Sequence, residues 1–100
     1  MQVSNTILEQ LGGSRFIAMT GASQFVGSDD ALSFALPGRL TRDGINKVRV
    51  TLTPADLYTV EFFHMARRGL VVETIATAEQ VYGDQLGATI ERHTGLRVSL

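Results

Sequence analysis

The spacing of apolar residues changes twice along the chain, and this change constrains the fold more than any other feature. Through the middle of the chain, apolar and polar residues alternate, which is typical of half-buried strands. Near both ends the apolar residues recur every three or four positions, which is typical of amphipathic helices. The segments predicted as strands are 15–20, 31–36, 46–53, 57–65 and 70–76.

Helices are predicted on both sides of these strands. Residues 4–11 are expected to form a short helix that stops at Gly12, because glycine readily takes the left-handed conformation after a last helical turn. A second helix is predicted to begin where Thr77 and Gln80 have the spacing of a capping box, and to end at Gly95.

Short polar connections separate the predicted strands. They cover residues 21–30, 37–45, 53–56 and 66–69. Connections this short favour an antiparallel meander. We therefore expect one α+β domain over residues 1–100, with a meander sheet of about five strands, a short N-terminal helix and a C-terminal helix packed on one face.

The composition is typical of a globular domain that has no disulfide bonds. Of 100 residues, 44% are hydrophobic and 19% are charged, which favours one domain with an ordinary core. No cysteine is present, so disulfides and thiolate metal sites are excluded and a reducing cytosol is compatible. The N-terminal segment lacks the pattern of a secretory signal, and no apolar stretch approaches the ~20 residues that would span a membrane.

The predicted meander gathers most basic residues at one end of the molecule. Alternate loops of a meander lie at the same end, which collects eight of the nine lysines and arginines, all except Arg49. The residues expected to contact nucleic-acid phosphates there are Arg39, Arg42, Arg67, Arg68 and Arg97. The opposite end receives Asp29, Asp30, Asp56 and Glu79. The competing interpretation is that these arginines are simply solvated residues of turns and of a helix terminus.

No catalytic or metal-binding motif is visible, and we expect neither an enzyme nor a cofactor. His64 and His93 lack a zinc-ligand spacing, and Glu61 would point to the face of its strand opposite His64. The Gly-Gly-Ser-Arg stretch at 12–15 lacks the phosphate-loop pattern and follows a helix. Ser14 has no evident His and Asp partners for nucleophilic catalysis.

Two glycines and two aromatic residues invite further predictions. Gly83 and Gly87 would share one helical face and allow a close backbone approach, either to the sheet, which we favour, or to a partner helix. Most aromatic residues have the spacing of core positions. Phe25 and Phe63 are the better candidates for exposure and for stacking on bases.

Five segments of the chain resemble a family of small proteins encoded by bacteriophages and prophages. They are LGGSRFIAMTGA (11–22), LSFALP (32–37), INKVRVTLTPADLYTVEFF (45–63), VYGDQL (81–86) and TGLRVSL (94–100). The resemblance implies a phage or mobile-element origin and a bacterial cytoplasm. It brings no assigned activity and no functional residue, and small phage proteins usually act by binding.

The function expected from these observations is binding rather than catalysis. The first hypothesis is an accessory protein that contacts nucleic acid or a nucleoprotein through its basic end. The alternative is a protein–protein inhibitor of a host-defence complex, of the anti-CRISPR type. It would act through an edge strand or through the loop that contains Gln24, Phe25, Asp29 and Asp30. A homodimer formed by edge strands or by the Gly83–Gly87 face stays open.

Overall fold

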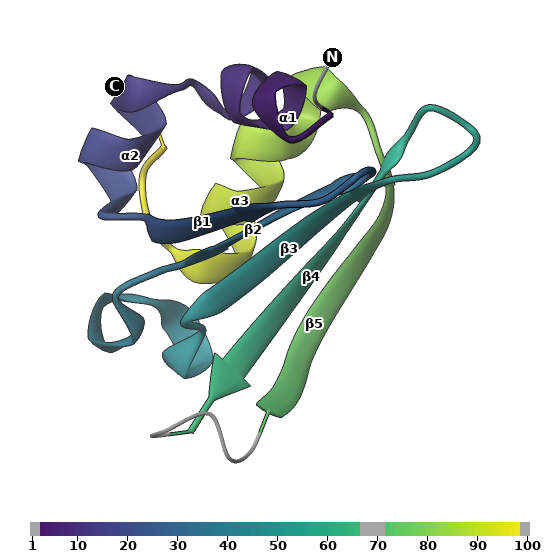
Figure 1. The fold of residues 1–100 in the computed structure, drawn as a ribbon. Helices are drawn as coiled ribbons and strands as arrows, with labels where there is room; N and C mark the ends of the chain where they lie inside the picture. The colour runs from purple at the N-terminus through teal and green to yellow at the C-terminus, as the bar shows by residue number, and fades with distance from the viewer. Residues whose placement is uncertain (1–2, 67–71, 99–100) are drawn as a thin grey trace.

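The chain folds into one open sheet with its helices on a single side. The computed structural model describes residues 3–66 and 72–98. The elements are α1 (Val3–Leu11), α2 (Ser14–Thr20), β1 (Ser23–Gly27), β2 (Ala31–Ala35), η1 (Gly38–Leu40), η2 (Arg42–Gly44), β3 (Lys47–Leu52), β4 (Tyr58–Met65), β5 (Val72–Val81), η4 (Gly83–Gln85) and α3 (Leu86–Thr94). The strands follow the order β1-β2-β3-β4-β5 with antiparallel neighbours (Figure 1). The predicted α+β meander is therefore confirmed.

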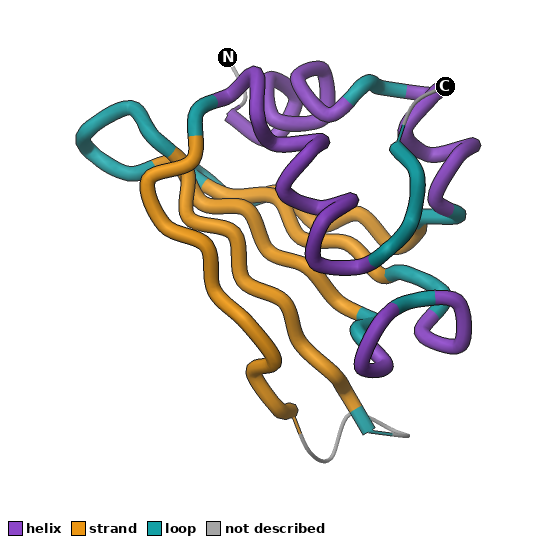
Figure 2. Tube along the Cα trace, turned by 180° about the vertical axis from the view of Figure 1, so that it is seen from behind, coloured by secondary structure: helices purple, strands orange, loops and turns teal. Residues whose placement is uncertain are grey.

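The core lies between one face of the sheet and the three α-helices (Figure 2). Register places Val48 between Phe34 and Phe62, and all three side chains are fully buried. Residues of the helices cover the other side of the core. The Phe16 ring of α2 contacts the Phe34 ring of β2 edge-on, with 5.4 Å between the ring centroids. No helix of the described residues lies on the opposite face of the sheet, so the side chains of that face form a surface (Figures 1 and 2).

Two helices end in the same way, at a Thr-Gly pair. The buried Thr20 hydroxyl donates to Phe16 O at 2.7 Å and accepts from Ala22 N at 3.2 Å. The buried Thr94 hydroxyl repeats this pattern with Ile90 O at 2.6 Å and Leu96 N at 3.2 Å. The glycine that follows each threonine takes a left-handed φ, 75° at Gly21 and 79° at Gly95. The predicted helix end at Gly95 is confirmed.

The predicted first strand was wrong, because residues 15–20 belong to α2. Phe16 and Thr20 are four residues apart and both buried, so the apolar pattern of this segment fits one face of a helical turn as well as alternate strand positions. The first strand lies instead within residues 21–30, which were predicted as a loop. β1 pairs with β2 through an irregular register near Gln24, whose φ of 54° marks the irregularity.

The start of the predicted C-terminal helix was also wrong. Residues 77–81 continue β5, where Ala78 pairs with Val60 and Val81 with Tyr58.

The neighbours of Gly83 and Gly87 also differ from the prediction. A Cβ on Gly83 would lie 2.5 Å from Gln10 Nε2 of α1, and one on Gly87 would lie 3.1 Å from Val98 Cγ2 of the C-terminal tail. Neither glycine serves an approach to the sheet.

No helix in the described part of the chain is long and apolar enough to cross a membrane.

Candidate binding surface: a cationic end and an open sheet face

The meander separates its loops into two groups. The β1–β2 and β3–β4 loops lie together, since Leu52 N donates to Asp30 O at 2.7 Å across them. Asp29, Asp30 and Asp56 therefore share one end of the molecule, as predicted from the meander. The η1–η2 connection and the first residue of β3, Lys47, lie at the other end of the sheet.

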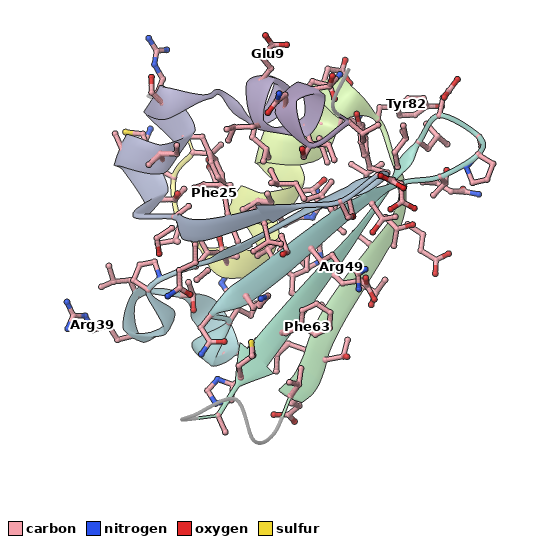
Figure 3. The ribbon with its side chains drawn as sticks, viewed as in Figure 1. Glu9, Phe25, Arg39, Arg49, Phe63 and Tyr82 are labelled. Carbon is pink, nitrogen blue, oxygen red and sulfur yellow. The ribbon has the colours of Figure 1, made fainter. Side chains whose placement is uncertain are left out.

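The connection that carries Arg39 and Arg42 is held in shape by hydrogen bonds. Thr41 Oγ1 donates within the connection, to Gly38 O at 3.0 Å. His64 Nδ1 donates to Gly44 O at 2.8 Å and so attaches the connection to β4. Arg39 and Arg42 are both exposed, and Arg39 projects away from the sheet (Figure 3). Their guanidinium groups are thus displayed from a defined backbone.

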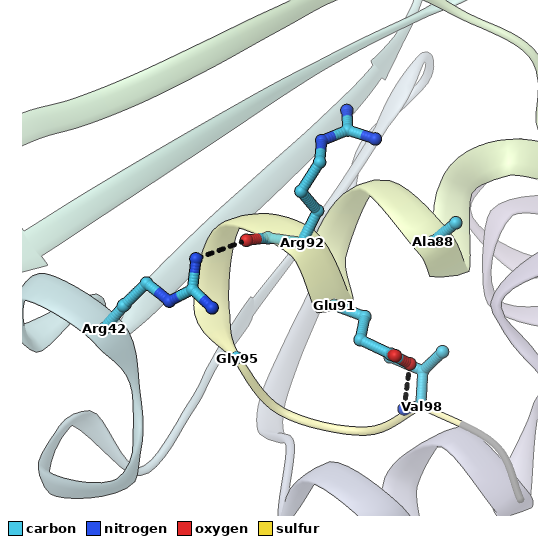
Figure 4. Close-up of a pocket in the computed structure, with 6 residues that line it drawn as sticks. All are labelled: Arg42, Ala88, Glu91, Arg92, Gly95 and Val98. Carbon is cyan, nitrogen blue, oxygen red and sulfur yellow. Dashed lines mark hydrogen bonds between the residues drawn. The ribbon is translucent and has the colours of Figure 1, made fainter.

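Arg42 also joins this connection to the end of α3. Its Nη1 donates to Arg92 O at 3.1 Å, although the two residues are 50 positions apart (Figure 4). A cation at this position satisfies a carbonyl of the last helical turn and suits the negative end of the helix dipole. Arg92 itself is exposed, so α3 adds a further cation to this end of the molecule.

A hollow of about 460 Å³ lies where these elements meet. It is lined by Arg42, Ala88, Glu91, Arg92, Gly95 and Val98 (Figure 4). Glu91 Oε1 accepts from Val98 N at 3.4 Å, which brings the C-terminal tail back along α3. Glu91 and the exposed Asp43 reduce the positive charge around the two arginines. We call Arg39, Arg42, Lys47 and Arg92 the cationic end.

The predicted phosphate-contact residues are only partly brought together. Arg39 and Arg42 lie in the same connection at the cationic end, and Arg97 is exposed on the tail that returns along α3. Arg67 and Arg68 lie outside the described residues. Arg15 was assigned to this end as the start of a strand, but it starts α2 instead. Gly21, which follows the C-terminal end of α2, lies next to Pro37. Arg15 is at the N-terminal end of α2, and about 9 Å of helical rise separates it from Gly21.

The uncovered sheet face next to the cationic end also carries candidate binding residues. Lys47 pairs directly with Phe63, and Arg49 pairs with Ser33 on one side and Glu61 on the other. Directly opposed residues share a face. Phe63 and Arg49 both project from this open face (Figure 3). Met65 and Val72 form the next pair, and Val72 is 55% exposed.

Phe25, the other aromatic residue predicted to be exposed, lies on the helix side. Its ring is 5.5 Å from that of the core residue Phe34, and the side chain is half-buried. Phe63 is also half-buried, but it is the one of the two that lies on the open face. The sequence carries a sign of this location, because Phe63 directly follows Phe62 in β4 and neighbouring strand residues point to opposite faces. Phe62 is buried in the core, so Phe63 points to the open face.

The described residues hold no group of three or more His, Asp or Glu side chains that could bind a metal ion. Both histidines use Nδ1 for backbone contacts, His64 with Gly44 O and His93 with Thr89 O at 2.9 Å. The His93 ring also stacks on Phe62 at 4.6 Å. Both imidazoles therefore have structural contacts within the fold. The groups that the candidate surface presents are cations, an aromatic ring and apolar side chains.

Comparisons of the chain with family models, with curated proteins and with solved structures gave no match.

Proposed function

We propose that this protein is a binding module that contacts nucleic acid, or a nucleoprotein, through its cationic end. The observation that carries the proposal is the hydrogen bond from the Arg42 guanidinium to the carbonyl of Arg92, 50 residues away. It holds the connection that displays Arg39 against the end of α3, where the Arg92 side chain is exposed. The chain has a formal net charge of −1, so this concentration of cations depends on segregation of charge rather than on excess. Segregated cations attract a polyanion locally even when the whole protein is near neutral.

Phosphate groups suit the side chains that this end displays. Guanidinium groups form paired hydrogen bonds with phosphate oxygens, and Arg39 and Arg92 are exposed for such contacts. Arg42 already donates one hydrogen bond to the end of α3, so it has fewer donors left. Asp43 and Glu91 weaken the local field. The proposal therefore implies binding of modest strength that depends on the salt concentration.

The proposal predicts that reversing the charge of Arg39 weakens nucleic-acid binding. Anisotropy titrations with labelled single-stranded and duplex DNA and RNA, at about 50 and 200 mM salt, should show binding that weakens steeply with salt. Arg39→Glu should weaken binding several-fold at the lower salt concentration. It should also lower the slope of log affinity against log salt by about 0.7 to 0.9 for each phosphate that the variant no longer neutralises.

Arg15→Glu is the matched control, because it makes the same charge change at an exposed position on α2. It should weaken binding much less than Arg39→Glu does. The double variant Arg67→Glu, Arg68→Glu extends the test to the predicted turn. Equal binding by the Arg39 and Arg15 variants, or binding that is insensitive to salt, would contradict the proposal.

A second candidate function is inhibition of a host protein complex by strand pairing. The observation that favours it is the pair of sheet edges, since among the described strands β1 and β5 each have a hydrogen-bonded neighbour on one side only. Val26 of β1 is 59% exposed, and such an edge can pair with a strand of another protein. The proposed setting for either function is a phage or mobile element in a bacterial cytoplasm. A stoichiometric protein partner that survives nuclease treatment in a pulldown would favour this second function.

A further inference from the structure

We infer that the open sheet face is a stacking site for single-stranded nucleic acid, with a base on Phe63 and phosphates at Lys47 and Arg49. The inference rests on the proposed function and assigns it a substrate class. The cationic end alone would attract any polyanion, single-stranded or duplex. The open face adds an aromatic ring, which responds to bases rather than to charge.

A groove on this face leads to the cationic end. One hollow of about 280 Å³ is lined by Ser33, Lys47, Arg49, Phe63, Met65 and Val72. A second hollow of about 270 Å³ is lined by Gln24, Ala35, Leu36, Asn46, Lys47 and Met65. Because both hollows include Lys47 and Met65, they adjoin there. The groove therefore crosses the strands of the sheet and reaches Asn46, at the start of β3.

The floor of this groove is held firmly. Asn46 Nδ2 donates to Met65 O at 2.9 Å, and Met65 N donates to Asn46 Oδ1 at 2.7 Å. These two bonds join the start of β3 to the end of β4. The paired backbones of β3 and β4 hold Lys47 opposite Phe63. A platform held in this way orders few groups on binding, which lowers the entropic cost of association.

The charges around Phe63 fit a strand of nucleotides. Within residues 3–66 and 72–98, neither Lys47 nor Arg49 forms an ion pair with a carboxylate, so both cations are available to phosphates. Glu61 faces Arg49 across the strands and limits the positive charge of the groove. Phe63 lies directly opposite Lys47 and diagonal to Arg49, and an aromatic ring beside two cations favours contacts with a base and its neighbouring phosphates.

Single strands fit this site better than duplexes. In a duplex the faces of the bases are stacked on one another, so a base must be unstacked before it can reach Phe63. A single strand presents its bases without that cost, and an aromatic ring accepts any of them because each base has a π-face. We therefore expect little preference for sequence and a clear preference for single strands.

A tryptophan placed at Phe63 tests the inference directly. The chain contains no tryptophan, so Phe63→Trp introduces a single indole whose fluorescence reports on base stacking. An oligothymidylate of about 12 nucleotides, within the usual range of site sizes, should quench this fluorescence at the concentrations at which anisotropy shows binding. Tyr82→Trp is the matched control. Tyr82 is exposed and lies beyond the opposite end of β5, far from Phe63 (Figure 3).

Phe63→Ala supplies the second readout. Loss of one stacked base should weaken oligothymidylate binding about 5- to 150-fold, with less than about a twofold effect on duplex binding. Quenching confined to the Phe63→Trp chain, together with this selective loss, would support the inference. If the Phe63→Trp chain binds oligothymidylate without quenching of its indole, the stacking inference is overturned. If Arg39→Glu still weakens binding in that case, the proposed function is retained. Absence of all nucleic-acid binding would contradict both proposals, as would a response of the indole to a partner protein alone.

Discussion

At the scale of single residues, the buried hydroxyls of Thr20 and Thr94 connect each helix to the chain that leaves it. Each hydroxyl donates to the carbonyl four residues earlier and accepts from the N–H two residues later. Together with the left-handed glycine, this bond pattern turns the chain sharply toward its next element. At Thr20 the next element is β1, and at Thr94 it is the tail that returns along α3.

Replacing either threonine with valine should therefore destabilise the fold. Thr94→Val retains the shape of the side chain but leaves the Leu96 N–H without its acceptor, so we expect a loss of about 1–3 kcal/mol in the free energy of unfolding. In a domain of this size each 1 kcal/mol lowers Tm by roughly 4–8 °C. Thermal unfolding measures this, with the exposed Thr77→Val as control. Equal Tm values for the Thr94 and Thr77 variants would contradict the assigned role.

At the scale of elements, a buried phenol connects β4 to α1. Tyr58 is 5% exposed, and its hydroxyl donates to Gln10 Oε1 of α1 at 2.7 Å. Burial, and secondarily the nearby negative charge of Asp56, raises the pKa of Tyr58 above its usual value of 10.0. The phenol is therefore harder to ionise in the folded chain than in the unfolded chain.

The raised pKa predicts a loss of stability at alkaline pH. Below pH 10.0 the phenol is neutral in both states, whereas above it the unfolded chain ionises first and unfolding becomes more favourable. Denaturant unfolding at a series of alkaline pH values should show this decline. Tyr58→Phe should remove the part of the alkaline decline that comes from ionisation of this phenol. The variant also loses the hydrogen bond to Gln10, which should lower the free energy of unfolding at neutral pH by about 1 kcal/mol. The same substitution at Tyr82 leaves the buried phenol in place and should retain the decline. An unaltered decline in the Tyr58 variant would contradict the prediction.

Element boundaries also show where local patterns sufficed. The three central strands were predicted because their alternation matches the burial of one face, as at Val48, Arg49 and Val50. The segment 15–20 carries a pattern that suits a helix or a strand, and contact of Phe16 with Phe34 favours the helix. Residues 77–81 have helical spacing but extend β5, because pairing with β4 satisfies their backbone groups over a long hairpin.

At the scale of the whole molecule, Arg42 links stability to the candidate surface. It joins the η1–η2 connection to the last turn of α3, whereas Arg39 only projects from that connection. Arg42→Gln should lower the free energy of unfolding by about 1 kcal/mol because a carbonyl at the end of α3 loses its charged donor. Arg39→Gln should change it by less than about 0.5 kcal/mol. Denaturant unfolding of both variants compares the two, and a larger loss for the Arg39 variant would contradict this assignment.

The sequence by itself determined the local features of this protein. Alternation predicted the strands whose inward face is apolar, and the glycines after the first and last helices marked their ends. These features depend on neighbours within a few positions, so they can be read from the chain directly.

Only the tertiary structure decided which distant residues meet. The bond from Arg42 to Arg92 and the pairing of Lys47 with Phe63 depend on the order and register of the strands and on the side of the sheet that α3 covers. The sheet has one covered face because the helices bury their apolar side chains against it, and the groove lies on the face left uncovered. Local spacing does not specify these relations, because they are selected by burial of the whole core.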